Sequence, residues 1–466
     1  MENFNFWDWE VWGVFNLLAV LLCSLLVANS LKKLIPALKR ALIPSSVLGG
    51  ILLLLVAVIY ESATGQNLFN TAFFGYKGAG TLEVLTYHGL ALGFIATTLK
   101  PSESKFSKQR SREIFDMGVS TVATYLLQGV LGLGVTIVAA LLVKDLFAAG
   151  GILLPFGYGQ GTGQALNYGN IYEQEHGFVG GRSFGLTIAA LGFLSASIGG
   201  VIHLNLLRRR GRKFDWGQED QEAKSITLQE IQKPNEIPMN GSIDKLTMQL
   251  VLIVLAYLMA FGLMRVLGNL VGALKSILFG FNFLLGVIAA SVIKAVNNWL
   301  MKKGIVRHQH ISSFLMTRLS GFFFDIMIVA GIAAIRINVI RDYWLILLIL
   351  GLVGAFSTYF YVRLFSKKLF PDYTEEQFMV SFGMLTGTAS TGIILLRELD
   401  PDFETPAAEN LVYQNFPAMI FGFPLMLLAA IAPERPVLTL LILIAFFAVM
   451  NLILFRHSIF GKKKKR

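Results

Sequence analysis

A short glycine-rich pattern occurs twice in this chain, once in each half, and both copies lie in strongly apolar sequence. Residues 156–162 read Phe-Gly-Tyr-Gly-Gln-Gly-Thr and residues 382–388 read Phe-Gly-Met-Leu-Thr-Gly-Thr, so both fit Phe-Gly-x-x-x-Gly-Thr. Irregular backbone of this kind is tolerated at membrane depth only where protein buries it or where it lines a watery cavity. Two such interruptions at corresponding places in two halves of a membrane protein indicate a transport site.

The composition indicates a polytopic membrane protein. Of the 466 residues, 55% are hydrophobic and only 15% are charged, and the mean hydropathy is +0.62. A soluble globular domain does not need so large an apolar share. The net charge of +11 does not indicate nucleic-acid binding, because Lys and Arg cluster in short segments between apolar runs. Clusters of that kind are determinants of membrane topology.

Apolar runs of about 17–25 residues predict the membrane spans. They number eleven and cover 11–28, 44–60, 84–99, 117–143, 183–207, 246–264, 277–293, 318–339, 343–362, 411–431 and 437–455. Two further apolar stretches, 146–170 and 376–396, contain the glycine motifs. Each of these two could cross the membrane fully or enter it and return on the same side.

The positions of the basic clusters favour the re-entrant alternative. Basic residues follow the spans 11–28, 84–99 and 183–207. The positive-inside rule places all three clusters on the cytoplasmic side. They can share that side only if 146–170 enters the membrane and returns on the side from which it entered. The same reasoning makes 376–396 enter from the cytoplasmic side. The N-terminus is then outside, and the basic C-terminal tail is cytoplasmic and contacts lipid headgroups.

This arrangement predicts an all-α polytopic fold built from two five-helix repeats. The N-terminal repeat covers 1–207 with its re-entrant segment, a polar cytoplasmic linker covers 208–245, and the C-terminal repeat covers 246–431 with its own re-entrant segment. An odd number of spans places the repeats in inverted topology, as in many secondary transporters. Residues 432–466 add one further transmembrane helix and the basic tail.

Several segments resemble the bacterial glutamate–sodium symporters. Residues 159–163 read Gly-Gln-Gly-Thr-Gly, which is similar to the first re-entrant loop of that family. Residues 43–50 fit the family's Ile-Pro-x-x-Val-x-Gly-Gly segment at the start of the second span. Residues 383–391 are similar in position and character to the second glycine-rich loop. The resemblance covers roughly residues 11–431.

The resemblance implies a sodium-coupled carrier that moves glutamate inward. It also implies two inverted five-span repeats with opposed re-entrant loops, an elevator-like movement, and a homodimer in the bacterial inner membrane. We expect no cofactor apart from Na⁺ as the coupling ion, and no further metal. The expected partners are a small anionic substrate, sodium, membrane lipids and a second copy of the chain.

The two glycine motifs supply the candidate substrate site. Short helices beside a re-entrant turn expose N–H groups that suit a carboxylate, and unwound carbonyls suit Na⁺. Glycine lets the backbone approach a ligand closely. The simpler alternative is that the glycines only permit tight helix packing. The candidate substrate-binding residues are Gly157, Gly159, Gln160, Gly161, Thr162, Gly163, Gln164, Gly383, Thr386, Gly387, Thr388, Ser390 and Thr391.

Asn167 and Asp325 are the candidate coupling-ion residues. A carboxylate within a span is costly and indicates function by default. Asp325 could bind Na⁺ or a proton, or it could pair with a cation such as Arg318, and both alternatives stay open. Arg336 near the outer end of the same span could extend to the interface or face a substrate carboxylate.

Other classes of protein are weaker alternatives. An intramembrane enzyme needs a positioned nucleophile and base, whereas His88 and His203 stand isolated in the sequence, so we expect no catalytic residue. A channel usually builds its filter from rings of repeated subunits. A carrier for a different organic anion, coupled to sodium or protons, is the nearer alternative.

Overall fold

The computed structural model describes residues 5–101, 107–212, 236, 244–271, 275–280, 282–401 and 404–456. Over these residues the structure is helical, with an isolated β-bridge between Glu236 and Gln309. Two compact units are present. The first comprises Met1–Leu22, Gln66–Lys105 and Gln218–Gly331, and the second comprises Cys23–Gly65, Phe106–Gly217 and Ile332–Arg466.

Ten helices in the described part of the chain are long and apolar enough to cross a membrane, which confirms a multi-pass protein. Each overlaps one of the predicted spans. The eleventh, 411–431, corresponds to a bent pair of helices, Ala407–Tyr413 and Pro417–Ile431. The predicted linker and basic tail fall largely on 213–235, 237–243 and 457–466, which lie outside the described residues.

Two predicted span boundaries are wrong. The span predicted at 277–293 is a short helix, α10 (Lys275–Gly280), followed by a separate helix that begins at Asn282. The span predicted at 318–339 ends at Ala333, and Arg336 has extended backbone. The backbone N–H of Arg336 donates to the hydroxyl of Ser183 (3.1 Å), which lies in the helix Gly181–Arg209.

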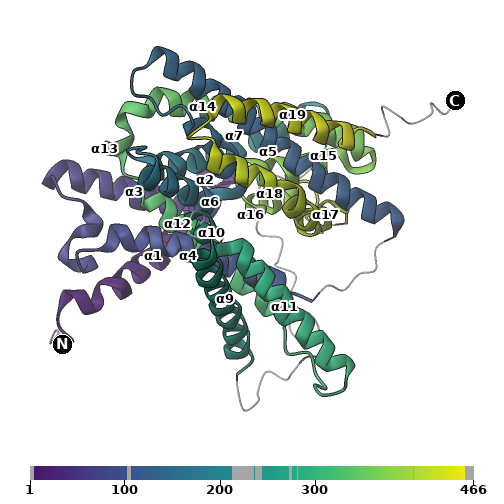
Figure 1. The fold of residues 1–466 in the computed structure, drawn as a ribbon, viewed down its shortest axis with the longest axis horizontal. Coiled ribbons are helices and arrows are strands. Elements are labelled where there is room, and N and C mark those ends of the chain that lie inside the picture. Colours follow the sequence, from purple (N-terminus) through teal and green to yellow (C-terminus); the bar gives the residue numbers. More distant parts are fainter. Residues whose placement is uncertain are drawn as a thin grey trace. The chain divides into compact units, whose positions relative to one another are not determined.

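The first unit has an apolar core formed mainly by side chains of α4 (Gly78–Leu99), α9 (Lys245–Leu270), α11 (Asn282–Lys302) and α12 (Ser313–Ala333). Many of the core side chains on α9 and α11 are alanines, and the two helices lie side by side (Figure 1). Small residues let membrane helices approach closely. Its elements are the first part of α1 (Trp9–Leu34), η1 (Leu68–Asn70), η2 (Ala72–Phe74), α4 (Gly78–Leu99), α9 (Lys245–Leu270), α10, α11 (Asn282–Lys302) and α12 (Ser313–Ala333).

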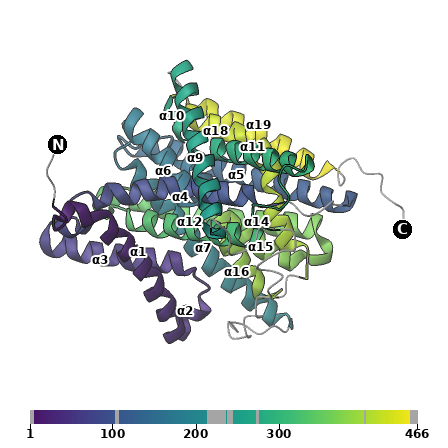
Figure 2. The ribbon, with the colours of Figure 1, turned by 90° about the horizontal axis from the view of Figure 1, so that it is seen from below.

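The second unit contains both glycine motifs. Figures 1 and 2 show its long α5 beside α19, and the contacts between the two confirm this. Its elements are α2 (Pro36–Arg40), α3 (Ser45–Thr64), α5 (Lys108–Leu142), η3 (Gly150–Ile152), α6 (Leu153–Glu175), α7 (Gly181–Arg209), α13 (Ile337–Ile340), η5 (Arg341–Tyr343), α14 (Trp344–Leu369), η6 (Pro371–Tyr373), α15 (Thr374–Thr386), α16 (Ala389–Arg397), α17 (Ala407–Tyr413), α18 (Asn415–Ile431) and α19 (Pro436–Leu454).

Backbone-to-backbone contact at glycines holds the second unit together. A Cβ added at Gly185 on α7 would lie 2.4 Å from the Ala165 carbonyl oxygen of α6. A Cβ at Gly132 on α5 would lie 2.2 Å from the carbonyl oxygen of Gly151. Real Cβ atoms do not approach oxygen this closely, so these positions admit only glycine without a backbone shift.

We expect Gly132→Ala to lower the free energy of unfolding by about 2 kcal/mol or more, because the added methyl group overpacks the contact with Gly151. Gly134→Ala is the matched control on the same helix, since a Cβ there meets nothing within 4 Å. The control should leave stability unchanged or raise it by about 0.5–1 kcal/mol. Thermal unfolding of both purified variants measures the difference, and equal melting temperatures would contradict the described packing.

Candidate functional site

The first glycine motif breaks helix α6 at Gly161. Its φ of 81° and ψ of −172° are not helical, although helical residues continue on both sides. This region of backbone conformation is essentially restricted to glycine. The break divides α6 into two helical segments, 153–160 and 162–175. The interruption that the sequence predicts in this apolar stretch is therefore located at Gly161.

The second glycine motif separates two helices. Helix α15 ends at Thr386, the backbone turns through Gly387 and Thr388, and α16 begins at Ala389. A Cβ at Gly387 would lie 2.9 Å from the Thr391 hydroxyl oxygen and 3.1 Å from the Phe193 ring. Both motifs therefore interrupt helices, and each places a glycine at the interruption.

The two interruptions lie next to each other. A Cβ built at Gly161 would lie 3.4 Å from the Thr388 side-chain methyl group. Helix α7 packs against both motifs, since a Cβ at Gly192 would lie 2.5 Å from the Thr386 carbonyl oxygen and 3.2 Å from Tyr158. Residues from the two halves of the chain thus form one cluster within the second unit.

Four helix ends come together at this cluster. The segments 162–175 and α16 begin there, and the segments 153–160 and α15 end there. The first N–H groups of a helix and its last carbonyls lack partners within the helix. The beginnings carry partial positive charge and the ends carry partial negative charge. The cluster can therefore interact with an anion and a cation at the same time.

The polar side chains of the cluster differ in exposure. Gln164 is 1% exposed; its Oε1 accepts from Asn167 Nδ2 (3.1 Å), while its Nε2 is buried with no hydrogen-bond partner. The Thr386 hydroxyl donates to the Phe382 carbonyl (2.6 Å). Thr162 and Thr391 are buried, Gln160 is partly buried, and Ser390 is exposed.

All candidate substrate-binding residues and Asn167 belong to the second unit. Asp325 does not, because it lies on the part of α12 that belongs to the first unit, where its side chain is partly buried. The Arg318 guanidinium, considered above as its partner, lies over the Phe314 ring at 5.2 Å from the centroid.

A charged cluster that the sequence analysis missed fixes the start of α15. Arg363 on α14 donates two hydrogen bonds to Glu375 (2.6 and 2.7 Å). His203 on α7 lies 2.9 Å from the same carboxylate through Nε2 and 2.8 Å from the Tyr359 hydroxyl through Nδ1. The view of His203 as an isolated residue is therefore wrong. No sequence spacing signals the cluster, because its residues come from three separate helices.

Glu375 lies in α15, which is not among the ten candidate spans. Burial alone would raise the pKa of its carboxyl, but the hydrogen bonds from His203 and Arg363 lower that pKa to about 2. The carboxylate therefore stays charged at neutral pH and holds α15 to α7 and α14.

Glu173 near the end of α6 forms a second charged cluster. Its carboxylate lies 3.6 Å from Arg336 Nη2 and accepts from the Arg182 N–H (3.1 Å). Arg182 Nε also donates to Asn170 Oδ1 (2.9 Å). Arg336 is thus held by a carboxylate near the C-terminal end of α6, twelve residues beyond the break at Gly161 (173 − 161 = 12).

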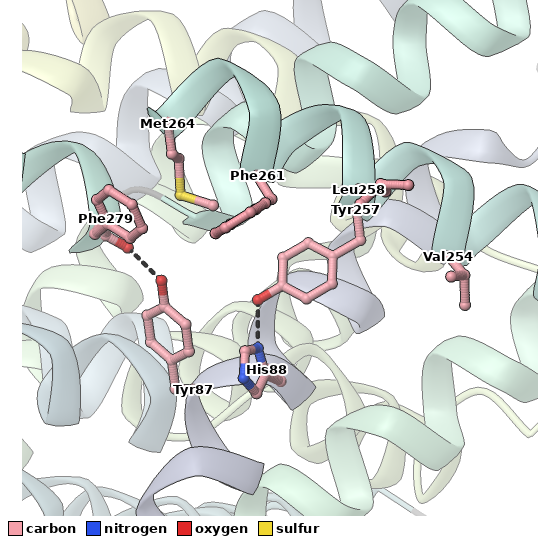
Figure 3. A pocket seen from close by; sticks show the side chains of 8 residues that line it. All are labelled: Tyr87, His88, Val254, Tyr257, Leu258, Phe261, Met264 and Phe279. Atoms are coloured by element: carbon pink, nitrogen blue, oxygen red, sulfur yellow. Dashed lines mark hydrogen bonds between the residues drawn. The ribbon is translucent and has the colours of Figure 1, made fainter. Parts of the chain in front are cut away.

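A separate pocket lies in the first unit (Figure 3), with a volume of about 340 Å³. His88 Nδ1 and the Tyr257 hydroxyl approach to 2.5 Å there, and the Tyr87 hydroxyl donates to the Phe279 carbonyl (2.7 Å). His88 is therefore not isolated either. None of the candidate site residues lines this pocket. The remaining lining residues are apolar, and they are Val254, Leu258, Phe261 and Met264.

A comparison with family models confirms the family resemblance found in the sequence. The family model described as Sodium/glutamate symporter matches residues 12–263, which is more than half of the chain and includes the first glycine motif. A comparison with curated proteins gives no significant match. The family match, together with the multi-span helical fold, shows that the chain belongs to the sodium/glutamate symporter family.

Proposed function

We propose that the protein is a secondary-active, sodium-coupled symporter that imports glutamate or a related small carboxylate. The observation that carries this proposal is that Gly161 and Thr388, one at each helix interruption, lie next to each other. Family membership supports the class of transporter and the two solutes. The site residues follow from the helix ends and the polar side chains that meet beside Gly161 and Thr388.

The substrate carboxylate interacts with the positive ends of two helical segments. The first N–H groups of 162–175 and of α16 supply donors on a glycine-rich surface, as in other anion sites at helix N-termini. Gln164 Nε2 is buried without a partner, so an incoming carboxylate oxygen satisfies it. The Thr388 and Ser390 side chains lie at the start of α16 and offer hydroxyl groups.

The negative ends of 153–160 and α15 suit the cation. Broken membrane helices coordinate Na⁺ through unwound carbonyls and helix C-termini. Asn167 lies two turns beyond the α6 break and remains a candidate ligand or neighbour of the ion. Asp325 is a second candidate for ion coupling, on the first unit.

The proposed topology rests on counting the bent pair of helices as one crossing. Eleven crossings, counting the bent pair as one, put the termini on opposite sides of the membrane. We place the N-terminus outside and the C-terminus in the cytoplasm, with α6 and α15–α16 entering from opposite sides as parts of two inverted repeats. Alternating access then takes place by an elevator-like movement in a homodimer of the bacterial inner membrane.

The direct test is uptake of radiolabelled glutamate into proteoliposomes under an inward Na⁺ gradient, with an inward K⁺ gradient as control. Accumulation that requires Na⁺ supports the proposal. Na⁺-dependent uptake of a different carboxylate in a competitor screen keeps the mechanism and replaces glutamate. Absence of ion-driven uptake of any carboxylate overturns the proposed function.

We expect Gly161→Ala to reduce uptake at least tenfold. Any side chain at this backbone conformation is strained by about 1–3 kcal/mol, and its Cβ also meets Thr388. Gly177→Asn is the matched control, because Gly177 also has positive φ (68°) but a Cβ there meets nothing within 4 Å. Initial rates are measured at equal protein in the membrane. Normal transport by Gly161→Ala would argue against a site at the two interruptions.

We expect Gln164→Leu to raise the KM for glutamate about tenfold or more, because a hydrogen bond to a charged group contributes about 1.5–3 kcal/mol. The maximal rate should change less than the KM. Asn205→Leu is a suitable control, since the Asn205 amide donates to Val201 of its own helix (3.0 Å). A KM within twofold of wild type would remove Gln164 from the substrate site.

A further inference from the structure

A buried polar seam runs along α5 between α15 and α17 in the second unit. At one end, the Tyr373 hydroxyl donates to Glu113 on α5 (2.8 Å). One turn further, Gln377 Nε2 donates to the Met117 sulfur (3.2 Å) and to the Ser381 hydroxyl (2.9 Å). Amide and hydroxyl groups buried among three apolar helices need partners for every polar atom.

In two amide side chains of the seam, the nitrogen donates two hydrogen bonds and the oxygen accepts none. Asn410 Nδ2 donates to the Tyr373 hydroxyl (2.9 Å) and to Gln377 Oε1 (2.8 Å). Gln414 Nε2 donates to the Met384 sulfur (3.3 Å) and to Asn415 Oδ1 (2.9 Å). These bonds fix the orientation of both amides. Asn410 Oδ1 and Gln414 Oε1 are buried and accept no hydrogen bond.

A third oxygen of this kind lies on α5, the helix that packs against α17 and α18. Thr121 is fully buried, and its hydroxyl oxygen has no partner. One turn earlier, a Cβ at Gly118 would lie 3.0 Å from the Gln414 carbonyl oxygen, and one residue later Val122 lies against Gly422. Thr121 therefore lies between two residues of α5 that contact the junction of α17 and α18.

The chemistry of these three groups favours a cation. Their oxygens accept no hydrogen bond and can therefore bind a cation. The amide nitrogens of Asn410 and Gln414 already donate two hydrogen bonds each, so neither has a donor for an anion. Neutral hydroxyl and amide oxygens are hard ligands of the kind that hard cations prefer. A bend in a membrane helix, such as that between α17 and α18, is also where transporters hold coupling ions.

We propose that Thr121, Asn410 and Gln414 form a site for a coupling Na⁺ ion. The site is additional to the candidates Asn167 and Asp325, and it rests on the proposed sodium-coupled function. The seam continues along α5 to Gln128, whose Nε2 donates to the Leu385 carbonyl (2.9 Å) in the last turn of α15. Occupation of the site therefore acts on the helix that ends at the second interruption.

The test compares Thr121→Val with Thr124→Val in the full-length protein. Thr124 is equally buried on the same helix, but its hydroxyl donates to the Ser120 carbonyl (2.7 Å). Two readouts are used: the rise in melting temperature of the purified protein on titration with NaCl, against choline chloride at equal ionic strength, and the Na⁺ concentration that gives half-maximal uptake.

We expect Thr121→Val to raise the half-saturating Na⁺ concentration at least fivefold in both readouts, and Thr124→Val to leave it unchanged. Thr121→Ser keeps the oxygen and should restore the wild-type value. Equal responses of the two valine variants would overturn the site while leaving Na⁺-driven uptake by the wild type intact. A wild type with neither Na⁺ stabilisation nor Na⁺-driven uptake would overturn the proposed function and the site together.

Discussion

Every backbone polar group at membrane depth needs a partner, and this requirement governs the second unit. A helix that breaks inside the protein releases N–H groups and carbonyls that lipid cannot satisfy. The chain breaks helices at Gly161 and again at Gly387 and Thr388, and it brings the two breaks next to each other. The helix ends therefore lie close to one another within the protein, at the place where we propose the transport site.

The surrounding packing makes that arrangement rigid. Tyrosine hydroxyls from inside the unit donate to backbone carbonyls of neighbouring helices, from Tyr125 to Gly159 (3.0 Å) and from Tyr168 to Met426 (2.8 Å). Glycines on α7 allow its backbone to approach both motifs. Close packing accounts for motif glycines such as Gly383, where a Cβ would lie 2.7 Å from the Gly392 Cα. The positive φ of Gly161 marks a conformation that packing alone does not demand.

Much of the fold could be predicted from the sequence, because the hydrophobic thickness of a bilayer fixes the length of a span. The spans overlap the observed helices, and the repeated motif located both interruptions. Boundaries at polar positions such as Arg336 could not be predicted, since tertiary partners decide them. The cluster of His203, Arg363 and Glu375 was missed for the same reason. The binding roles of the motif residues and the inverted repeats remain predictions.

The composition of the second unit has a consequence for how the protein is made. Its segments come from three separate parts of the chain, and α5 packs against α19, which ends at Leu454. The surface of α5 that packs against α19 is therefore covered only after α19, near the end of the chain, has been synthesised. The broken helix α6 in particular emerges long before the segment that contains Thr388. A nascent chain thus adds 227 residues (388 − 161) between Gly161 and Thr388 before the two breaks can meet, a period when incomplete proteins are prone to misassembly.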